Sequence, residues 1–458
     1  MDTNTLDALK SALPGRVFAP SDPEYAASAG GWNLTIAHRP VAIVQAESEA
    51  DVVEAARWAN RHGLPVSTQS TGHGPFRICD GGLLIRTRGL GSIAVDPVAK
   101  TATVGAGAVW GDVIAATFPH GLSPVSGSAP HVGVVGYTLG GGFGILSRQF
   151  GLAADHLKRV RLVKPDGQVV DASATENPDL FWALRGGGGA FGVVTELEFG
   201  LMEFNHVFGG SVMFDHSLAG EVLPKFAEWS AGLPNEVSTA VHLMNFPPVP
   251  MIPEFLHGRS MVIVIGASTL PEEQAAAHFA PMRELPGAEF DSYSWKPYTR
   301  CGEIYQDPID PLPVMGRGVM LSRLGAEGIR TFMEAVGPQP HSPNLMIQIR
   351  RLGGAIKEVE SSASALDRVR QAEYLIYLIG VPMGPATPEA IVSHAEGVIA
   401  AMQPFALGRG PLNWLGEGDV PSEHVRGVFS ADAQARMQSV KAAVDPSNAF
   451  RFAGVGVD

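Results

Sequence analysis

The stretch "SGSAPHVGVVGYTLGGGFGILSRQFGLAADHL", residues 126–157, combines apolar residues with closely spaced glycines. Its least polar part, residues 132–146, is too short and too rich in glycine to form a membrane-spanning helix. Glycine lets the main chain approach a bound molecule closely and direct its N–H groups at anionic oxygen atoms. The stretch therefore predicts a region where the main chain itself contacts a ligand.

Two other segments have the same character. "TQSTGHGPF" (68–76) places His73 directly after small and hydroxyl side chains, and "LFWALRGGGGAFGVVTELEF" (180–199) contains four consecutive glycines. Any one such segment is more often a turn or a tight packing contact. All of them together favour a diphosphate held by main-chain N–H groups in place of lysine or arginine. A Rossmann site and a P-loop are not predicted, because no glycine run opens the first helix and the P-loop lysine is missing.

Length, composition and charge limit the number of domains, the class of protein and its possible partners. The chain has 458 residues, enough for about two to four domain-sized units. Hydrophobic residues make up 45% and charged residues 17%, which is typical of a globular protein with a well-buried core. The formal net charge of -13 argues against nucleic acids and anionic membranes as partners.

The cysteines and the N-terminus indicate the compartment. Cys79 and Cys301 are far apart and lack zinc-binding spacing, so we expect free thiols in a reducing compartment and no metal site. The first residues have neither the basic nor the apolar part of a secretory signal. A cytoplasmic location is the resulting expectation.

Hydrophobic patterning predicts a strand, a helix and a strand over residues 40–46, 48–63 and 64–69. Ser48, with Asp51 three residues on, is a candidate N-cap, and Gly63 is a candidate helix stop. Residues 158–173 predict a hairpin. After about residue 205, helices alternate with widely spaced strands, which predicts an α+β unit with a largely antiparallel sheet; these strands are 237–246, 259–268, 344–354 and 372–383.

In this order and spacing, the motifs resemble the flavoproteins of the vanillyl-alcohol oxidase superfamily. The similarity is to the berberine-bridge-enzyme-like and 6-hydroxy-D-nicotine-oxidase-like branch. It covers most of the chain, although residues 206–400 are much less specific. The matching segments are 31–74, 105–113, 133–157, 177–199, "LNWLGEG" (412–418) and "MQSVKAAVDPSNAFRF" (437–452).

The resemblance implies an α+β fold, with a PCMH-type FAD-binding domain of two subdomains and an inserted substrate domain built on an antiparallel sheet flanked by helices. The expected FAD-binding domain comprises residues 1–205 and 408–458. The expected substrate domain comprises residues 206–407.

The resemblance also implies FAD as cofactor. In the family, the loop matched by "QSTGH" holds the FAD diphosphate, and its histidine commonly bonds to the 8α-methyl group of the isoalloxazine. His73 is therefore the expected 8α-N-histidyl attachment site, with non-covalent packing on FAD as the alternative, because Ser70 and Thr71 replace the usual glycines. The residues implied in FAD binding are Gln69, Ser70, Thr71, Gly72, His73, Gly74, Pro130, Val132, Gly133, Gly136, Tyr137, Gly140, Gly141, Gly142, Gly144, Gly192, Val194, Asn413 and Asn448.

Several positions depart from the family pattern or modify it. Ala129 stands where many relatives have a second attachment residue, so no 6-S-cysteinyl link is expected. Val132 matches a position where a small aliphatic side chain leaves oxygen a path to the flavin, which favours an oxidase. Ala190 and Val444 replace an asparagine and a tyrosine that are usual in relatives.

Residues on the substrate side are harder to assign. Tyr137 and Asn413 are the catalytic candidates, although Tyr137 could serve only as a packing ring. Trp414 is expected to form a wall of the substrate site. Gln348 and Arg350 share one strand face and are candidate substrate residues, and Arg350 would favour an acidic or carbonyl-bearing substrate. The alternative for this pair is an ordinary solvent-facing position.

The resemblance thus implies an FAD-dependent oxidoreductase. An oxidase is favoured, taking hydride from a C–H next to O or N of a small alcohol, amine or natural-product-like metabolite and passing electrons to O2. The alternatives are a dehydrogenase with another acceptor, a sugar oxidase and a non-catalytic flavin-binding protein. We expect a monomer or homodimer whose partners are small molecules, with no nucleic acid or membrane.

Overall fold

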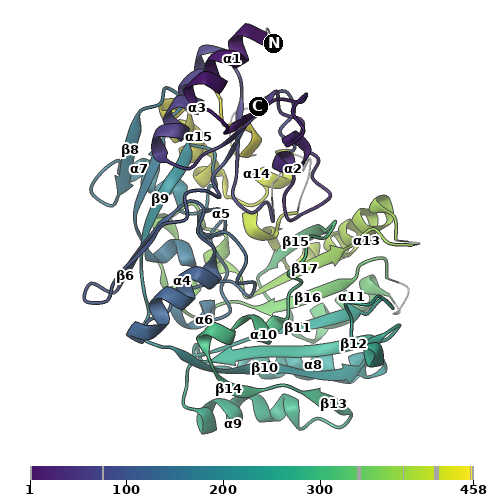
Figure 1. Cartoon of the computed structure of the whole chain (residues 1–458). Helices are drawn as coiled ribbons and strands as arrows, with labels where there is room; N and C mark the ends of the chain where they lie inside the picture. Colours follow the sequence, from purple (N-terminus) through teal and green to yellow (C-terminus); the bar gives the residue numbers. More distant parts are fainter. Residues whose placement is uncertain are drawn as a thin grey trace.

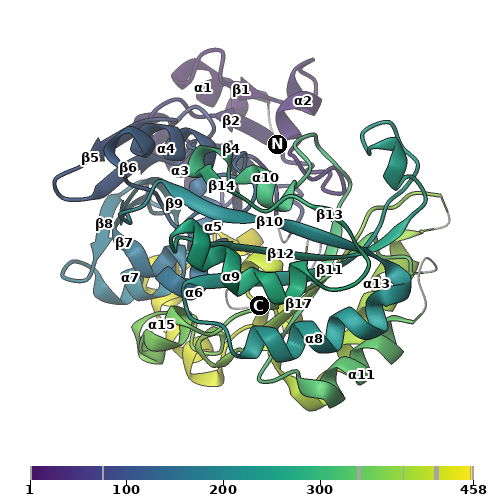
Figure 2. The same cartoon turned by 90° about the horizontal axis from the view of Figure 1, so that it is seen from below.

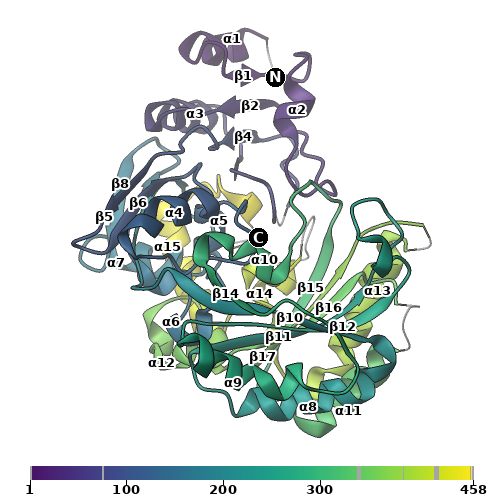
Figure 3. The same cartoon turned by 60° about the horizontal axis from the view of Figure 1, so that its bottom comes forward.

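The computed structural model describes residues 3–74, 77–337, 342–384, 386–416, 422–453 and 455. Within these residues, the strands form sheets of four, five and nine strands, which we call the N-terminal, middle and large sheets. Figure 1 and Figure 3 show the N-terminal sheet at one end of the molecule and the large sheet at the other. Helices and antiparallel sheets are combined as the predicted α+β class requires.

The N-terminal sheet has the order β1 (Val17–Phe18), β2 (Ala42–Gln45), β4 (Leu83–Arg86), β3 (Val66–Gln69). β2 and β3 are parallel to β4, which lies between them. The connecting helix α3 (Glu49–Arg61) begins at a capping box formed by Ser48 and Asp51. It ends before Gly63, whose φ of +63° is in the left-handed region. The predicted strand–helix–strand unit and both helix signals are confirmed.

The middle sheet is antiparallel, with the order β5 (Ile93–Asp96), β6 (Thr101–Gly105), β9 (Val193–Gly200), β7 (Leu157–Val163), β8 (Val169–Ser173). The predicted hairpin of residues 158–173 is confirmed as β7 and β8. The chain between β6 and β7 forms α4 (Trp110–Thr117), α5 (Val134–Leu139) and α6 (Ser147–Phe150), and α7 (Pro178–Leu184) precedes β9.

The large sheet is also antiparallel and includes every strand predicted beyond residue 205. Those strands are β11 (Val237–Asn245), β12 (Ser260–Ser268), β16 (Met346–Arg351) and β17 (Tyr374–Gly380). The sequence pattern missed the remaining members, which are β10 (His206–Asp215), β13 (Ala288–Asp291), β14 (Ser294–Pro297), β15 (Met315–Leu321) and β18 (Ala406–Arg409).

Helices cover one face of the large sheet, as Figure 2 shows. These are α8 (Ala219–Ala231), α9 (Glu272–Arg283), α11 (Gly325–Val336) and α13 (Pro388–Ala401). Ile347 and Ile349 of β16 join the apolar core beneath the helices. Because side chains alternate along a strand, Gln348 and Arg350 point to the opposite face, toward the rest of the molecule. Both are buried, so the solvent-facing alternative for this pair is wrong.

Short helices and the C-terminal segment complete the chain. The remaining helices are α1 (Thr3–Ala12), α2 (Tyr25–Ala29), α10 (Gly302–Tyr305), α12 (Ala355–Glu358), α14 (Ser422–Arg426) and α15 (Ala431–Val444). After α15, the main chain returns to the N-terminal sheet, where the N–H of Val66 donates to the carbonyl of Ala449. Both cysteines are buried and form no disulfide, as predicted. A search of the described helices finds none with the length and apolar character needed to cross a membrane.

Candidate functional site

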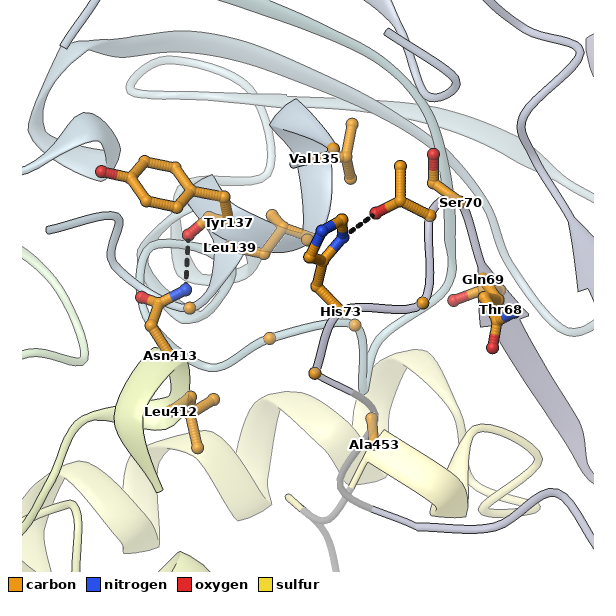
Figure 4. Close-up of a pocket in the computed structure, with 18 of the residues that line it drawn as sticks. Thr68, Gln69, Ser70, His73, Val135, Tyr137, Leu139, Leu412, Asn413 and Ala453 are labelled. Carbon is orange, nitrogen blue, oxygen red and sulfur yellow. Dashed lines mark hydrogen bonds between the residues drawn. The ribbon is translucent and has the colours of Figure 1, made fainter. Parts of the chain in front are cut away.

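A cavity of about 380 Å³ lies where the three glycine-rich segments and the C-terminal segment meet (Figure 4). Many of the predicted site residues line it; these are Gln69, Ser70, Thr71, Gly72, His73, Gly74, Val132, Gly133, Gly136, Tyr137, Gly140, Gly192, Val194, Asn413 and Trp414. Others lie outside this lining, namely Pro130, Gly141, Gly142, Gly144, Gln348, Arg350 and Asn448. Residues that line it without having been predicted include Thr68, Val135, Leu139, Phe143, Leu412 and Ala453.

The first glycine-rich segment is a tight loop fixed by buried hydrogen bonds. Gln69, at the end of β3, donates to the carbonyl of Gly30 over 2.9 Å and lies 2.8 Å from Nε2 of His38. Gly72 has a φ of +78°, and a Cβ there would be 2.7 Å from the Cα of Gly31. Only glycine fits this position without moving the main chain.

His73 is held in one orientation inside this loop. Its Nδ1 lies 2.8 Å from Oγ1 of Thr71, and its ring stacks on Trp32 with ring centres 4.6 Å apart. On another side, the ring of His131 lies 4.9 Å away. Burial and, to a smaller extent, the neighbouring His131 lower the pKa of His73 to about 3. The imidazole is therefore neutral near pH 7, the form that carries a nucleophilic lone pair.

The second segment approaches the cavity through α5 and the glycines that follow it. Asn413 donates to the carbonyl of Tyr137 over 3.0 Å and accepts from the N–H of Gly142 over 2.9 Å. A Cβ on Gly140 would be 2.7 Å from Nδ2 of Asn413. Asn413 therefore joins the C-terminal segment to the glycine-rich turn across the cavity wall.

Replacing Asn413 by alanine is expected to weaken binding of the FAD that the motifs imply by about tenfold or more, because two hydrogen bonds that shape the wall are lost at about 1 kcal/mol each. The measurement is FAD release on dilution, in a His73→Ala background that excludes covalent retention. The exposed Asn60 of α3 offers the matched control, Asn60→Ala, which should release FAD at the unchanged rate. Equal release rates for both variants would contradict the role of Asn413.

The third segment packs under the second. The N–H groups of Gly186 and Gly188 both donate to the carbonyl of Leu139, at the end of α5. The carbonyl of Ala190 accepts from the buried Lys441 of α15 over 2.6 Å. This segment thus connects α5 to α15. It forms the side of the cavity that we call the floor.

Tyr137 is half-buried in the lining of the cavity, and its hydroxyl oxygen is buried. Its ring packs edge-on against Trp110 with ring centres 5.4 Å apart. Its hydroxyl has no hydrogen-bond partner within the described part of the chain. Burial raises the pKa of Tyr137, although Arg350 opposes the effect. The group is therefore a neutral hydrogen-bond donor near pH 7.

A second group of polar residues adjoins the cavity on the side of the large sheet. Arg350 lies over the ring of Trp414, 4.7 Å from its centre, and over the ring of Tyr305 at 5.0 Å. Gln348 contacts His242 of β11, with 2.5 Å between Nε2 of Gln348 and Nε2 of His242. The structure thus brings the predicted residues Gln348, Arg350 and Trp414 together.

Sequence reasoning missed several residues around the site. Trp32 and His131, which flank His73, lie in segments 31–74 and 126–157, but no local signal there predicts a contact with His73. Tyr305 and Asp307 follow β14 in a segment that carries no motif. Burial raises the pKa of Asp307, while Ser128, Arg350 and His131 act in the opposite direction. Only the tertiary structure places this carboxyl group near the other residues.

The lining fits the cofactor that the motifs imply. Gly74 and Gly136 line the cavity, and a Cβ at either would meet no atom of the described residues within 4 Å, so a ligand can approach the main chain there. Among the described residues, Oγ of Ser70, Nε2 of His73 and the hydroxyl of Tyr137 are buried without hydrogen-bond partners. Buried polar atoms are normally paired, so these atoms indicate a polar ligand in the cavity.

Comparison with known proteins agrees with this assignment. A family model described as an FAD binding domain matches residues 40–173. An FAD-linked oxidoreductase of Dictyostelium discoideum is 27% identical, with 98% of this chain and 96% of that protein covered. (R)-6-hydroxynicotine oxidase of Paenarthrobacter nicotinovorans is also 27% identical, with 96% of each protein covered.

Solved structures show the same fold over the whole chain. The crystal structure of 6-hydroxy-D-nicotine oxidase from Arthrobacter nicotinovorans superposes with a TM-score of 0.80 at 26% identity, covering 96% of this chain and 97% of that one. A chitooligosaccharide oxidase superposes with a TM-score of 0.84 at 21% identity, covering 99% and 100%. With the cavity and its lining, these matches show that the chain is an FAD-dependent oxidoreductase that contains an FAD-binding domain and is similar over most of its length to 6-hydroxynicotine oxidase.

Proposed function

We propose that the enzyme is an oxidase that holds FAD through a single covalent bond to His73 and passes electrons from a small organic substrate to O2. The observation that carries the proposal is the half-buried His73 imidazole, which is neutral, is fixed by Thr71 at the edge of the cavity and has a buried Nε2. Ala129 supports a single attachment, because it has no nucleophilic side chain.

When bound, FAD accepts a hydride from a substrate C–H next to oxygen or nitrogen. The chain supplies binding and orientation. Main-chain N–H groups of residues 69–74 would hold the diphosphate, whereas those of Gly140, Gly142 and Gly144 already donate to Gly136, Asn413 and Ser147 and shape the neighbouring turn. Asn413 maintains the turn, and Trp414 would form a wall of the substrate site. We assign Tyr137 the role of hydrogen-bond donor rather than proton acceptor, because its raised pKa keeps the phenol neutral.

The proposal also assigns the two domains, the cellular location and the assembly of the enzyme. An FAD-binding unit of residues 1–205 and 408–458 would hold the cofactor, and residues 206–407 would cover the substrate. The buried, unpaired cysteines support a reducing, cytoplasmic location. The expected assembly is a monomer or homodimer.

The oxidase assignment is tested by two measurements on the purified yellow protein. Screening alcohols, amines and sugars without air should identify substrates that bleach the flavin absorbance. With those substrates in air, hydrogen peroxide should form in a one-to-one ratio to product. Bleaching without peroxide would indicate a dehydrogenase, and a lack of bleaching by every compound would favour a binding protein without turnover.

Replacing Val132 by leucine is expected to slow flavin reoxidation by O2 about tenfold, which corresponds to about 1.4 kcal/mol in the barrier. Val132 lines the cavity, and a larger side chain there would narrow the path of oxygen to the flavin. The measurement mixes reduced protein with aerated buffer in a stopped-flow instrument. Val135→Leu is the matched control, because Val135 also lines the cavity. If both variants reoxidise at the rate of the parent, Val132 does not control oxygen access.

A further inference from the structure

Arg350 is a buried cation that has no carboxylate ion-pair partner among the residues that the structure describes. Its relative exposure is 6%, and its guanidinium lies between the rings of Tyr305 and Trp414. The hydrogen bond found for it is a 3.3 Å contact from Nη1 to the carbonyl of Phe143, and Nε is buried with no partner in the described structure. Within the same residues, Arg350 forms no ion pair within 4.0 Å.

Among the described residues, no group that faces Arg350 forms an ion pair with it. Burial and, to a smaller extent, the charge of Arg350 lower the pKa of His242 to about 3, so the His242 imidazole is neutral. Burial raises the pKa of both Tyr137 and Tyr305, which keeps these phenols neutral. Asp307 is the acidic group that interacts with Arg350. Burial raises the pKa of Asp307, Arg350 acts in the opposite direction, and no ion pair joins the two side chains in the described part of the chain. A buried charge is normally paired, so the arrangement is incomplete without an anion.

Arg350 does not line the cofactor cavity, but it contacts residues that do. Trp414 and Phe143, which both contact Arg350, line that cavity. Next to Arg350 on the same face of β16, Oε1 of Gln348 is buried and unpaired among the residues described. The flanking aromatic rings hold the planar guanidinium in place and leave its edge for hydrogen bonds. An acidic group bound there would lie on the sheet side of Trp414, and the oxidised carbon would lie nearer the cavity.

We propose that Arg350 binds a carboxylate of the substrate, and that the enzyme therefore oxidises a carboxylic acid in preference to its neutral analogues. This inference rests on the proposed function, because it assigns the substrate class of the same site. It distinguishes the chain from a carbohydrate oxidase, whose substrate is neutral. The planar guanidinium of arginine can donate two parallel hydrogen bonds to a carboxylate, which the ammonium group of lysine cannot do. Lysine at position 350 should therefore retain only part of the affinity for the carboxylate.

The test uses the flavin-containing protein and pairs of probes that differ only in charge. The pairs are acetate and acetamide, benzoate and benzamide, and phenylacetate and phenylacetamide. Binding is followed by the change in flavin absorbance and, independently, by the shift in melting temperature. At least one carboxylate should bind about tenfold more tightly than its amide, because only the carboxylate pairs with the guanidinium. Arg350→Gln should abolish this preference, and Arg350→Lys should keep part of it.

The exposed Arg330 of α11 provides the control variant, Arg330→Gln, which should retain the full preference. Arg350→Lys also serves as the informative variant if Arg350→Gln does not fold. Equal affinity for every acid and its amide, or an undiminished preference in both Arg350 variants, would overturn the inference. Failure of the proposed function would look different, because the protein would lack flavin or would produce no peroxide with any substrate.

Discussion

The His73→Ala protein is expected to lose all of its acid-stable flavin. When the parent protein is precipitated in acid, the yellow colour should remain in the pellet, whereas the variant should release it into the supernatant. The reason is that a covalent bond survives unfolding and non-covalent contacts do not. The bonded fraction, measured by mass spectrometry of the intact protein, should fall from nearly complete to zero.

The pKa of His73 adds a prediction about rate. Because burial holds that pKa at about 3, the neutral imidazole is already fully populated from pH 5 upward. If apoprotein is mixed with FAD, the rate of covalent attachment should not rise through the usual titration range of histidine, near pH 6.5. A rate that increases with that apparent pKa would show that His73 is more exposed to water than the structure indicates.

His62→Ala is the matched control for His73→Ala. His62 caps the C-terminal end of α3, away from the cavity lining, and should leave attachment complete. If the His73→Ala pellet stays yellow, the attachment residue is another side chain. If the parent pellet is colourless, the flavin is held non-covalently and His73 only packs against it.

The residues around His73 show what local sequence can and cannot predict. The loop from Gln69 to Gly74 follows a predicted strand, and its glycines and small residues indicate close main-chain contact. Local rules are sufficient there, because turns and caps depend on neighbours in sequence. The sequence did not show that Trp32 would stack on His73, because that contact joins separate segments.

The substrate side illustrates the same limit. Period-two alternation put Gln348 and Arg350 on one strand face, and the structure confirms that they share it. The alternation alone could not show that this face is buried. Nor could it show that His242 of β11 would lie beside Gln348, because that pairing depends on strand register. Edge strands such as β13 and β18 were missed because they are short, and their position depends on pairing with longer neighbours.

A buried ion pair in the C-terminal segment holds the cavity floor together. Asp445 accepts from Nζ of Lys441 over 2.6 Å and from the N–H groups of Ala449 and Phe450 over 2.8 and 2.9 Å. Lys441 also donates to the carbonyl of Ala190, in the third glycine-rich segment. Both charged side chains are almost completely inaccessible to solvent. The pair therefore connects α15, the return to the N-terminal sheet and the glycine-rich floor.

Asp445→Asn is expected to lower the free energy of unfolding by about 3–5 kcal/mol, because it leaves the Lys441 charge buried without a counter-charge. The measurement is urea denaturation of the flavin-containing protein. The Asp179–Arg436 pair is exposed, so Asp179→Asn should cost less than about 1 kcal/mol and serves as the matched control.

The double variant Lys441→Met with Asp445→Asn separates a lost attraction from an unpaired charge. Since methionine removes the charge that Asp445→Asn leaves behind, the double variant should be less destabilised than the sum of the single variants. In the double variant, the carbonyl of Ala190 still loses its hydrogen-bond donor, Lys441. The cavity floor should therefore be less rigid than in the parent protein, and FAD should be released faster when both are compared in a His73→Ala background. Additive single effects, or a loss below about 1 kcal/mol for Asp445→Asn, would show that water reaches this pair and that packing alone holds the floor.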